Sequence, residues 1–105
     1  MINVNIKATD IELTPQISDY LNKKIASLEK FVSENDEAAY ADVEIGRTTN
    51  HHRTGNVYFT EINFKIANEN MRARAEGDSL ISSMDKAKDK ALEVLREKKG
   101  RQKDH

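Results

Sequence analysis

The order in which two hydrophobic periods follow each other constrains the fold of this 105-residue chain most strongly. A period of two, with apolar and polar side chains alternating, is typical of a half-buried strand. It occurs in four segments, which are residues 1–7, 39–45, 57–67 and 71–76. The sequence therefore predicts four strands, the last three of them consecutive.

A period of three to four residues, typical of an amphipathic helix, separates and follows these strands. It predicts helices over residues 15–32 and from about 80 to 98. Thr14 followed by Pro15 provides a helix start, and Asp78 or Ser79 can cap the second helix. The order βαβββα predicts an α+β fold, in which two helices cover one face of a four-stranded sheet and the other face meets solvent.

The last two strands also allow a prediction of register. If Glu69 and Asn70 form a two-residue turn, Ile66 faces Ala73 and Phe64 faces Ala75. A slip by one residue would mix the apolar and polar faces, which excludes it. We expect one domain over residues 1–99 and a flexible basic tail over residues 100–105.

The distribution of charge is uneven along the chain, although its net charge is only −1. Residues 86–103 carry eight basic and three acidic groups, whereas residues 1–85 carry nine basic and fourteen acidic groups. A basic helix at the end of an acidic chain is typical of nucleic-acid binding, but also of a solvated helix face. The charge alone leaves both interpretations open.

The same sequence gives no support for an enzyme, a cofactor or a metal site. It has no cysteine, no clustered glycines for a phosphate loop, and no apolar segment near the roughly 20 residues that cross a membrane. His51 and His52 are adjacent in an expected loop and point to opposite sides, so a single metal ion rarely binds both. We expect a cytoplasmic protein without a small-molecule substrate.

Basic side chains are the remaining candidates for function. If both helices pack on one sheet face, their outer surfaces lie side by side and pool their lysines into a surface that contacts phosphates. A second candidate is the open sheet face with Lys65, Arg72 and Arg74, although cross-strand pairing with Glu61 and Glu76 is the favoured interpretation. The candidate RNA-binding residues are Lys23, Lys24, Lys30, Lys86, Lys90 and Lys99 of the helices, and Arg47 and Arg53 of the hairpin.

Several short segments stand out together with the order of the elements. They are Leu13–Ile17, Leu28–Lys30, and the run from Ala73 to Gly77 with Asp85 and Asp89–Lys90 after it. In these segments and in the order of elements, nearly the whole chain resembles the family of hibernation-promoting factors and ribosome-associated inhibitors, also called sigma-54 modulation or ribosomal subunit interface proteins.

This resemblance implies a fold akin to a double-stranded-RNA-binding domain and a partner, the small ribosomal subunit with its rRNA. It implies binding in the channel used by mRNA and tRNA, and inhibition of translation during ribosome hibernation under stress or slow growth. Lys24, Lys30, Lys90 and Lys99 match basic positions of the family. We expect the free protein to be a monomer. The alternatives are a general structured-RNA-binding module and an interaction protein that modulates transcription.

Overall fold

The computed structural model describes the backbone of residues 2–48 and 57–103, and the side chains of these segments as far as residue 99. It confirms the α+β fold and the order βαβββα. The elements are β1 (Asn3–Thr9), α1 (Pro15–Ala26), the short 3-10 helix η1 (Glu29–Phe31), β2 (Tyr40–Arg47), β3 (Tyr58–Ile66), β4 (Glu69–Gly77) and α2 (Leu80–Lys103).

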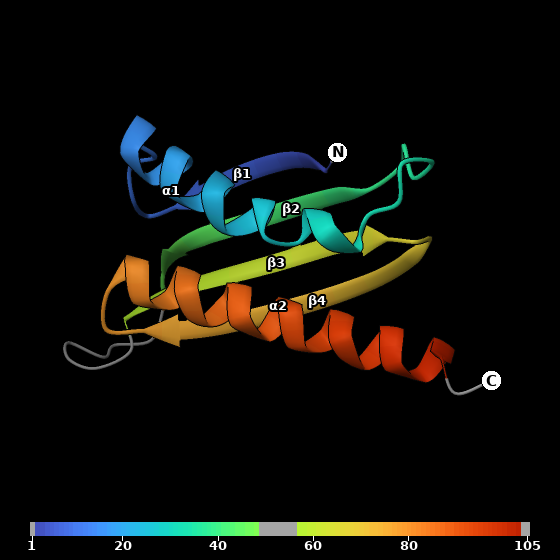
Figure 1. Ribbon diagram of the computed structural model, residues 1–105. Helices are drawn as coiled ribbons and strands as arrows, with labels where there is room; N and C mark the ends of the chain where they lie inside the picture. The colour runs from blue at the N-terminus through green and yellow to red at the C-terminus, as the bar shows by residue number, and fades with distance from the viewer. Residues whose placement is uncertain (1, 49–56, 104–105) are drawn as a thin grey trace.

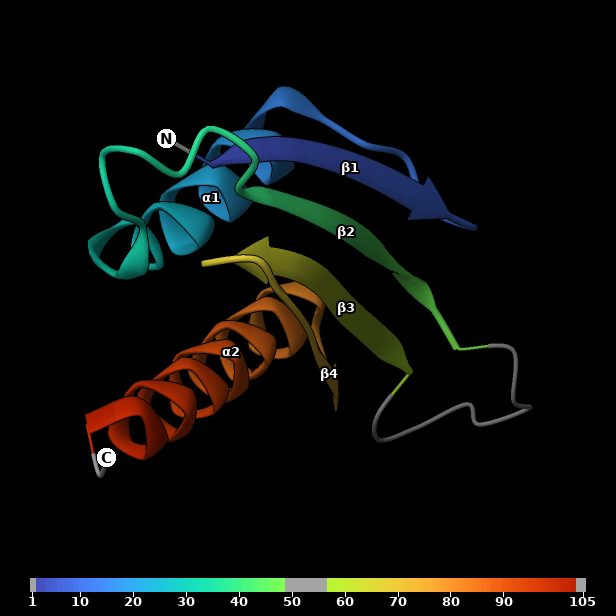
Figure 2. The same cartoon turned by 90° about the vertical axis from the view of Figure 1, so that its right-hand side faces the viewer.

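The four strands form one sheet in their sequence order, with β1 parallel to β2 and the other two pairs antiparallel. Both helices lie on the same face of this sheet, α1 beside β1 and β2, and α2 along β3 and β4 (Figure 1). Seen along the sheet, the opposite face carries no helix (Figure 2). The molecule therefore has one helical face and one open sheet face.

Apolar side chains of the sheet and the two helices form one core. The largest fully buried ones are Phe64, Ile45 and Ile62 from the strands and Leu21 and Ile25 from α1. The inward positions alternate with outward ones along β2, β3 and β4, as the period of two predicts, and the outward positions are mostly polar, with Phe59 as an apolar exception. The face that the sequence marks as apolar is the one the helices cover.

The first helix ends earlier than the sequence predicts. Its start is as expected, because the Thr14 side chain accepts a hydrogen bond from the Ile17 N–H at 3.2 Å and Pro15 occupies the first turn. However, α1 stops at Ala26, where the Ser27 hydroxyl donates to the Lys24 carbonyl at 2.6 Å. This side-chain bond competes with the helical ladder. The chain then turns into η1 instead of continuing to residue 32.

The predicted turn lies two residues too late in the chain, so the predicted register between the last two strands is wrong by four residues. The turn consists of Ala67 and Asn68, both with positive φ (56° and 63°), and Phe64 pairs with Met71. Two residues with φ > 0 are the requirement of the tight hairpin turn whose twist matches that of the strands. A shift by an even number of residues keeps each side chain on its face, so the apolar pattern could not detect it.

The second helix is longer than expected. Ser79 caps it, since its hydroxyl accepts a hydrogen bond from the Ser82 N–H at 3.0 Å, which confirms one of the two candidates. The helix continues to Lys103 and not only to about residue 98. The backbone of residues 100–103 therefore belongs to the helix, whereas the sequence had predicted the tail to begin at residue 100.

Substitutions in the hairpin turn test the register. We expect the double variant Ala67→Asn/Asn68→Gly to raise the free energy of unfolding by about 1 kcal/mol, because alanine in the left-handed region is strained and Asn-Gly suits this turn. The matched variant Glu69→Asn/Asn70→Gly places the same dipeptide inside β4, and should lower stability by about 0.5–1 kcal/mol. Urea unfolding measures both. The opposite ranking would support the register with Glu69 and Asn70 in the turn.

Candidate nucleic-acid interface

On the open sheet face, the arginines are paired with neighbouring side chains. Arg72 forms an ion pair with Glu61 across β3 and β4. Arg74 lies 3.7 Å from Glu76 and stacks its guanidinium 4.4 Å from the ring centre of Phe59. The first pair is the cross-strand pairing favoured from the sequence, whereas Arg74 and Glu76 pair within β4. Among the described basic residues of the open face, only Lys7 and Lys65 are left without an ion pair.

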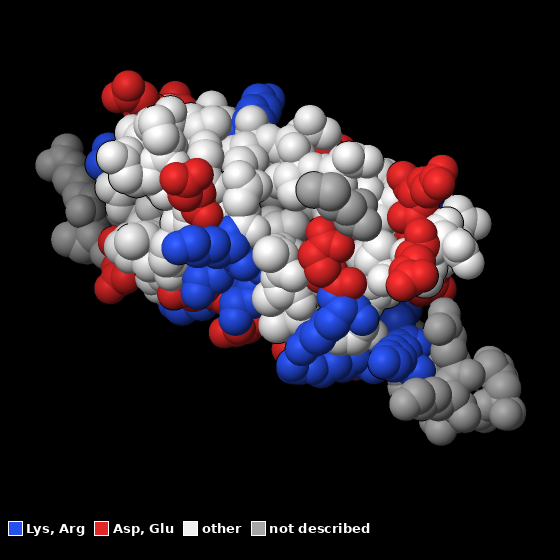
Figure 3. Space-filling view, turned by 45° about the horizontal axis from the view of Figure 1, so that its top comes forward, with Lys and Arg blue, Asp and Glu red and all other residues white. Residues whose placement is uncertain are grey.

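The helical face carries several exposed lysines that form no ion pair within the described part of the chain. Lys23, Lys30, Lys86 and Lys99 are exposed, and none is in an ion pair with another residue that the structure describes. Blue side chains gather along the lower side of the view in Figure 3, towards the C-terminal end of the molecule. Exposed ammonium groups without carboxylate partners are suited to contact phosphates. They make this face the candidate interface.

Lys24, also predicted to bind RNA, instead joins the two helices. Its ammonium lies 3.1 Å from Asp85 of α2 and 4.9 Å from the centre of the Tyr20 ring. The Tyr20 hydroxyl donates to the same Asp85 oxygen at 2.7 Å. The hydrogen bond from Tyr20, followed by Lys24, lowers the pKa of Asp85, and Asp85 raises the pKa of Lys24. We call Tyr20, Lys24 and Asp85 the interhelical clamp.

Asp85 makes different contacts from those that its position in the sequence predicts. Because Asp85 and Asp89 are four residues apart among lysines, the sequence predicts ion pairs along the solvent face of one helix. Asp89 does pair with its neighbour Lys88 at 2.7 Å, but Asp85 bonds to side chains of α1. Its role is to connect the helices.

Lys30 and Lys99 meet at the far end of the helical face. Their ammonium groups lie 5.6 Å and 5.8 Å from the centre of the Phe31 ring. Lys30 and Phe31 belong to η1 and Lys99 to α2, so the break after α1 places them together. Both lysines were candidates in the sequence analysis, but the aromatic side chain between them was missed because Phe31 fits the pattern of a continuous helix over residues 15–32.

Lys86 and Lys90 lie on another flank of α2, so the predicted pooling of all helix lysines is only partly correct. The Lys90 ammonium donates to the Arg74 carbonyl of β4 at 3.0 Å, which places it on the side away from α1. Lys86 precedes it by one helical turn and shares that side. Glu93 and Glu97 follow on the same side at helical spacing. The structure thus separates two basic groups, Lys30/Lys99 and Lys86/Lys90.

The hairpin candidates are only partly described. Arg47 is exposed at the end of β2, where it lies 5.4 Å from the Tyr58 ring centre and donates to the Tyr58 hydroxyl at 3.3 Å. This contact raises the pKa of Arg47, which is charged in any case. Arg53, His51 and His52 lie outside the described residues. In the described part, no group of carboxylates or histidines is arranged to hold a metal ion.

The family model described as "Sigma 54 modulation protein / S30EA ribosomal protein" matches residues 4–103. The chain belongs to this family. The family resemblance found in the sequence is thus confirmed, and with it the expectation that the chain is a ribosome-associated protein and not an enzyme. None of the helices that the structure describes is long and apolar enough to cross a membrane.

Two solved structures of similar fold accompany this family assignment. The N-terminal domain of Protein Y from Thermus thermophilus matches with a TM-score of 0.73 and 22% sequence identity, over 91% of this chain and 96% of that chain. A ribosomal subunit interface protein from Coxiella burnetii matches with a TM-score of 0.72 and 13% identity, over 94% of this chain and 99% of that chain. Together they show that this S30EA chain shares their fold.

The interhelical clamp should make stability depend on pH. The pKa of Asp85 is lower in the folded state, so its contribution is present above the ordinary carboxyl pKa of about 4 and is lost as pH falls through the folded value. At pH 7 we expect Asp85→Asn to cost about 1 kcal/mol, a small value because the Asp85 side chain is 41% exposed. Below pH 3 the difference from the wild type should shrink.

Lys24 acts at the other end of the pH range. Its pKa is raised, so its contribution is present below the ordinary lysine value and is lost as pH rises through the folded value. Thermal unfolding between pH 2 and pH 11 measures both limits. Asp89→Asn is the control, since the Asp89 side chain is 70% exposed and pairs only with Lys88 of its own helix. An Asp85→Asn effect as small as that of Asp89→Asn would contradict the clamp.

Proposed function

We propose that this S30EA-family chain binds the small ribosomal subunit in the channel used by mRNA and tRNA, and thereby inhibits translation. The observation that carries this proposal is the contrast between the two faces. Lys23, Lys30, Lys86 and Lys99 of the helical face form no ion pair with another described residue, whereas Arg72 and Arg74 of the open face are paired. Family membership supplies the ribosome as the partner, and the location of such a complex would be the cytoplasm.

The chemistry of the helical face favours contact with the RNA backbone. Lysine ammonium groups are compact charges that meet phosphates without reading bases, and phosphate contacts set the position of a protein on RNA. Both helices contribute such groups, and the clamp of Tyr20, Lys24 and Asp85 fixes the helices relative to each other. A rigid arrangement of cations suits a folded rRNA surface, on which phosphate positions are fixed.

The two basic groups of this face should contribute unequally. Lys86 and Lys90 share their flank with Glu93 and Glu97, which lower the local positive potential. Lys30 and Lys99 flank an aromatic ring, and neither forms an ion pair in the described part of the chain. A count of lysines alone would instead favour α2 as the main contact with RNA. We infer that the Lys30/Lys99 group is the stronger contact.

Sedimentation and translation assays test the proposal directly. In gradients of a cell extract, the protein should move with small subunits or whole ribosomes. A general RNA-binding module would spread over all RNA-containing fractions, and a transcription modulator would stay near the top. In a reconstituted system, saturating protein should reduce peptide synthesis, and excess mRNA and tRNA should relieve the block. Full peptide synthesis with subunits saturated by the protein would refute inhibition.

The salt dependence of binding tests which lysines make contact. Each phosphate contact contributes about 0.7–0.9 to the slope of log affinity against log salt. Lys30→Ala/Lys99→Ala should weaken subunit binding and reduce this slope by about 1.4–1.8, which corresponds to two contacts. Lys86→Ala/Lys90→Ala should have a smaller effect. These exposed substitutions should change stability by only about 0.5 kcal/mol.

The matched control is Lys7→Ala/Lys65→Ala, which removes two charges from the open sheet face. It should leave both the affinity and the slope close to the wild-type values. If this control weakened binding as much as the helix variants, the open face would be part of the interface. Filter binding of labelled small subunits at several salt concentrations gives all the slopes.

A further inference from the structure

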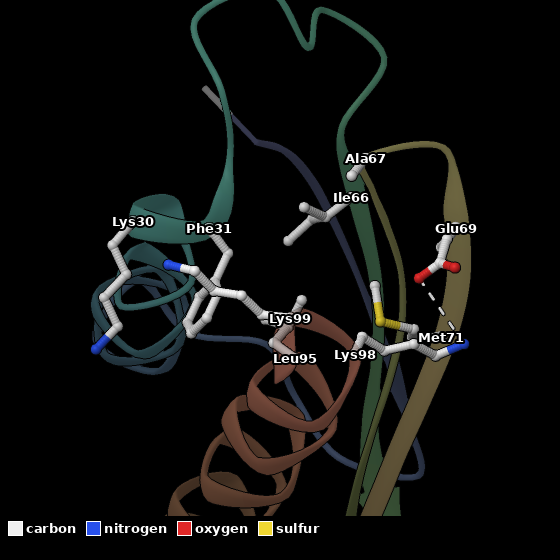
Figure 4. A pocket seen from close by; sticks show the side chains of 9 residues that line it. All are labelled: Lys30, Phe31, Ile66, Ala67, Glu69, Met71, Leu95, Lys98 and Lys99. Carbon is white, nitrogen blue, oxygen red and sulfur yellow. Dashed lines mark ion pairs between the residues drawn. The ribbon is translucent and has the colours of Figure 1, made fainter. Parts of the chain in front are cut away.

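A small pocket opens at the end of the helical face where Lys30 and Lys99 meet. It lies where η1, the end of β3, the start of β4 and the last turns of α2 meet, and has a volume of about 180 Å³ (Figure 4). Its floor consists of Ile66, Met71 and Leu95, which are 2%, 8% and 4% exposed. Phe31 forms one wall. The interior is therefore apolar, with one aromatic ring at its side.

The rim of this pocket is basic. Lys30, Lys98 and Lys99 line it, and Glu69 is the one acidic side chain among its lining residues. Glu69 lies 3.8 Å from Lys98, as the dashed line in Figure 4 marks, so it offsets that lysine only. Lys30 and Lys99 both stay within 6 Å of the Phe31 ring centre. Two like charges held around one ring repel each other, which an anion between them would relieve.

The size of the pocket limits what can enter. Pockets that enclose a whole small-molecule ligand measure about 300–1,000 Å³, so 180 Å³ suits one flat group of a larger partner. Such a group should be apolar on its faces, able to stack on Phe31, and joined to an anion that reaches Lys30 and Lys99. A nucleobase with its own phosphates has these properties. Proteins commonly recognise single-stranded RNA by stacking unpaired bases on aromatic side chains.

We propose that this pocket binds one unstacked base of a single-stranded RNA segment, with the base against Phe31 and Met71 and the adjoining phosphates on Lys30 and Lys99. The inference rests on the proposed function, because it names the kind of RNA that the Lys30/Lys99 group would contact. Binding in this pocket requires an unpaired base, whereas contact with the phosphate backbone of RNA does not. This requirement gives the site a preference for rRNA loops, bulges or ends over continuous duplex.

The three methionines of the chain provide a direct test. Met71 lines the pocket, whereas Met84 is a core side chain with 1% exposure. In the full chain with ¹³C-labelled methionine methyl groups, a uridine pentanucleotide should shift the Met71 signal and leave the Met84 signal in place. The matched probe is the same pentanucleotide backbone without bases. It should bind more weakly and leave Met71 nearly unchanged.

Variants of Phe31 separate stacking from charge. Phe31→Leu keeps an apolar side chain but removes the ring, and should weaken pentanucleotide binding by about 5- to 150-fold, as expected for the loss of one base stack. Binding of the base-free backbone should not change. Phe31→Tyr retains a ring and should restore most of the affinity. An unchanged Met84 signal and unchanged melting temperature show that each variant is folded.

Two outcomes would overturn the inference. One is an equal Met71 shift with the base-free backbone, which would make the site a simple anion contact. The other is full pentanucleotide affinity in Phe31→Leu. The same proteins are tested for small-subunit binding in parallel. Subunit binding by the wild type without any base effect refutes the pocket alone, whereas a base effect without subunit binding refutes the proposed function and leaves the pocket standing.

Discussion

The covering of a single apolar sheet face by two helices is the constraint on which the rest of this structure depends. Every second residue of the strands points to that face, and the other face is polar. Apolar strand residues must leave water, and only two amphipathic helices are available to cover them. Both helices are therefore forced side by side, and their polar surfaces become one continuous face. The placement of the lysines follows from the burial of the core.

Charge partners, rather than charge counts, then distinguish the two surfaces. Arg72 and Arg74 are as basic as any lysine, but Glu61 and Glu76 lie within reach in the neighbouring or same strand. Some helix lysines are paired as well: Lys24 with Asp85 in the seam between the helices, Lys88 with Asp89, and Lys98 with Glu69. The cations available to an external anion are those that have no carboxylate partner within the protein.

Sequence periodicity predicted the architecture well, because burial imposes a period on each element. It predicted the order of the elements, the apolar faces and the Thr14 cap. It could not predict features that depend on geometry between elements, such as the contact of Asp85 with α1. The turn at Ala67 and Asn68 was missed for another reason, since alanine gives no signal for positive φ and a register shift of four residues keeps the faces intact. The ribosome was predicted as the partner from the family resemblance, because no pattern of residues in the sequence identifies it.

The end of α1 illustrates how a small local interaction creates a functional surface. A helix continued to residue 32 would carry Lys30 and Phe31 onward along its own axis. The bond from the Ser27 hydroxyl to the Lys24 carbonyl accompanies the end of the helix, and η1 then turns Phe31 towards the last turns of α2. There Phe31 meets Lys99, above a floor formed by Ile66 and Leu95. The aromatic wall and the two cations thus come from segments almost 70 residues apart, and they form a site only because the first helix ends early.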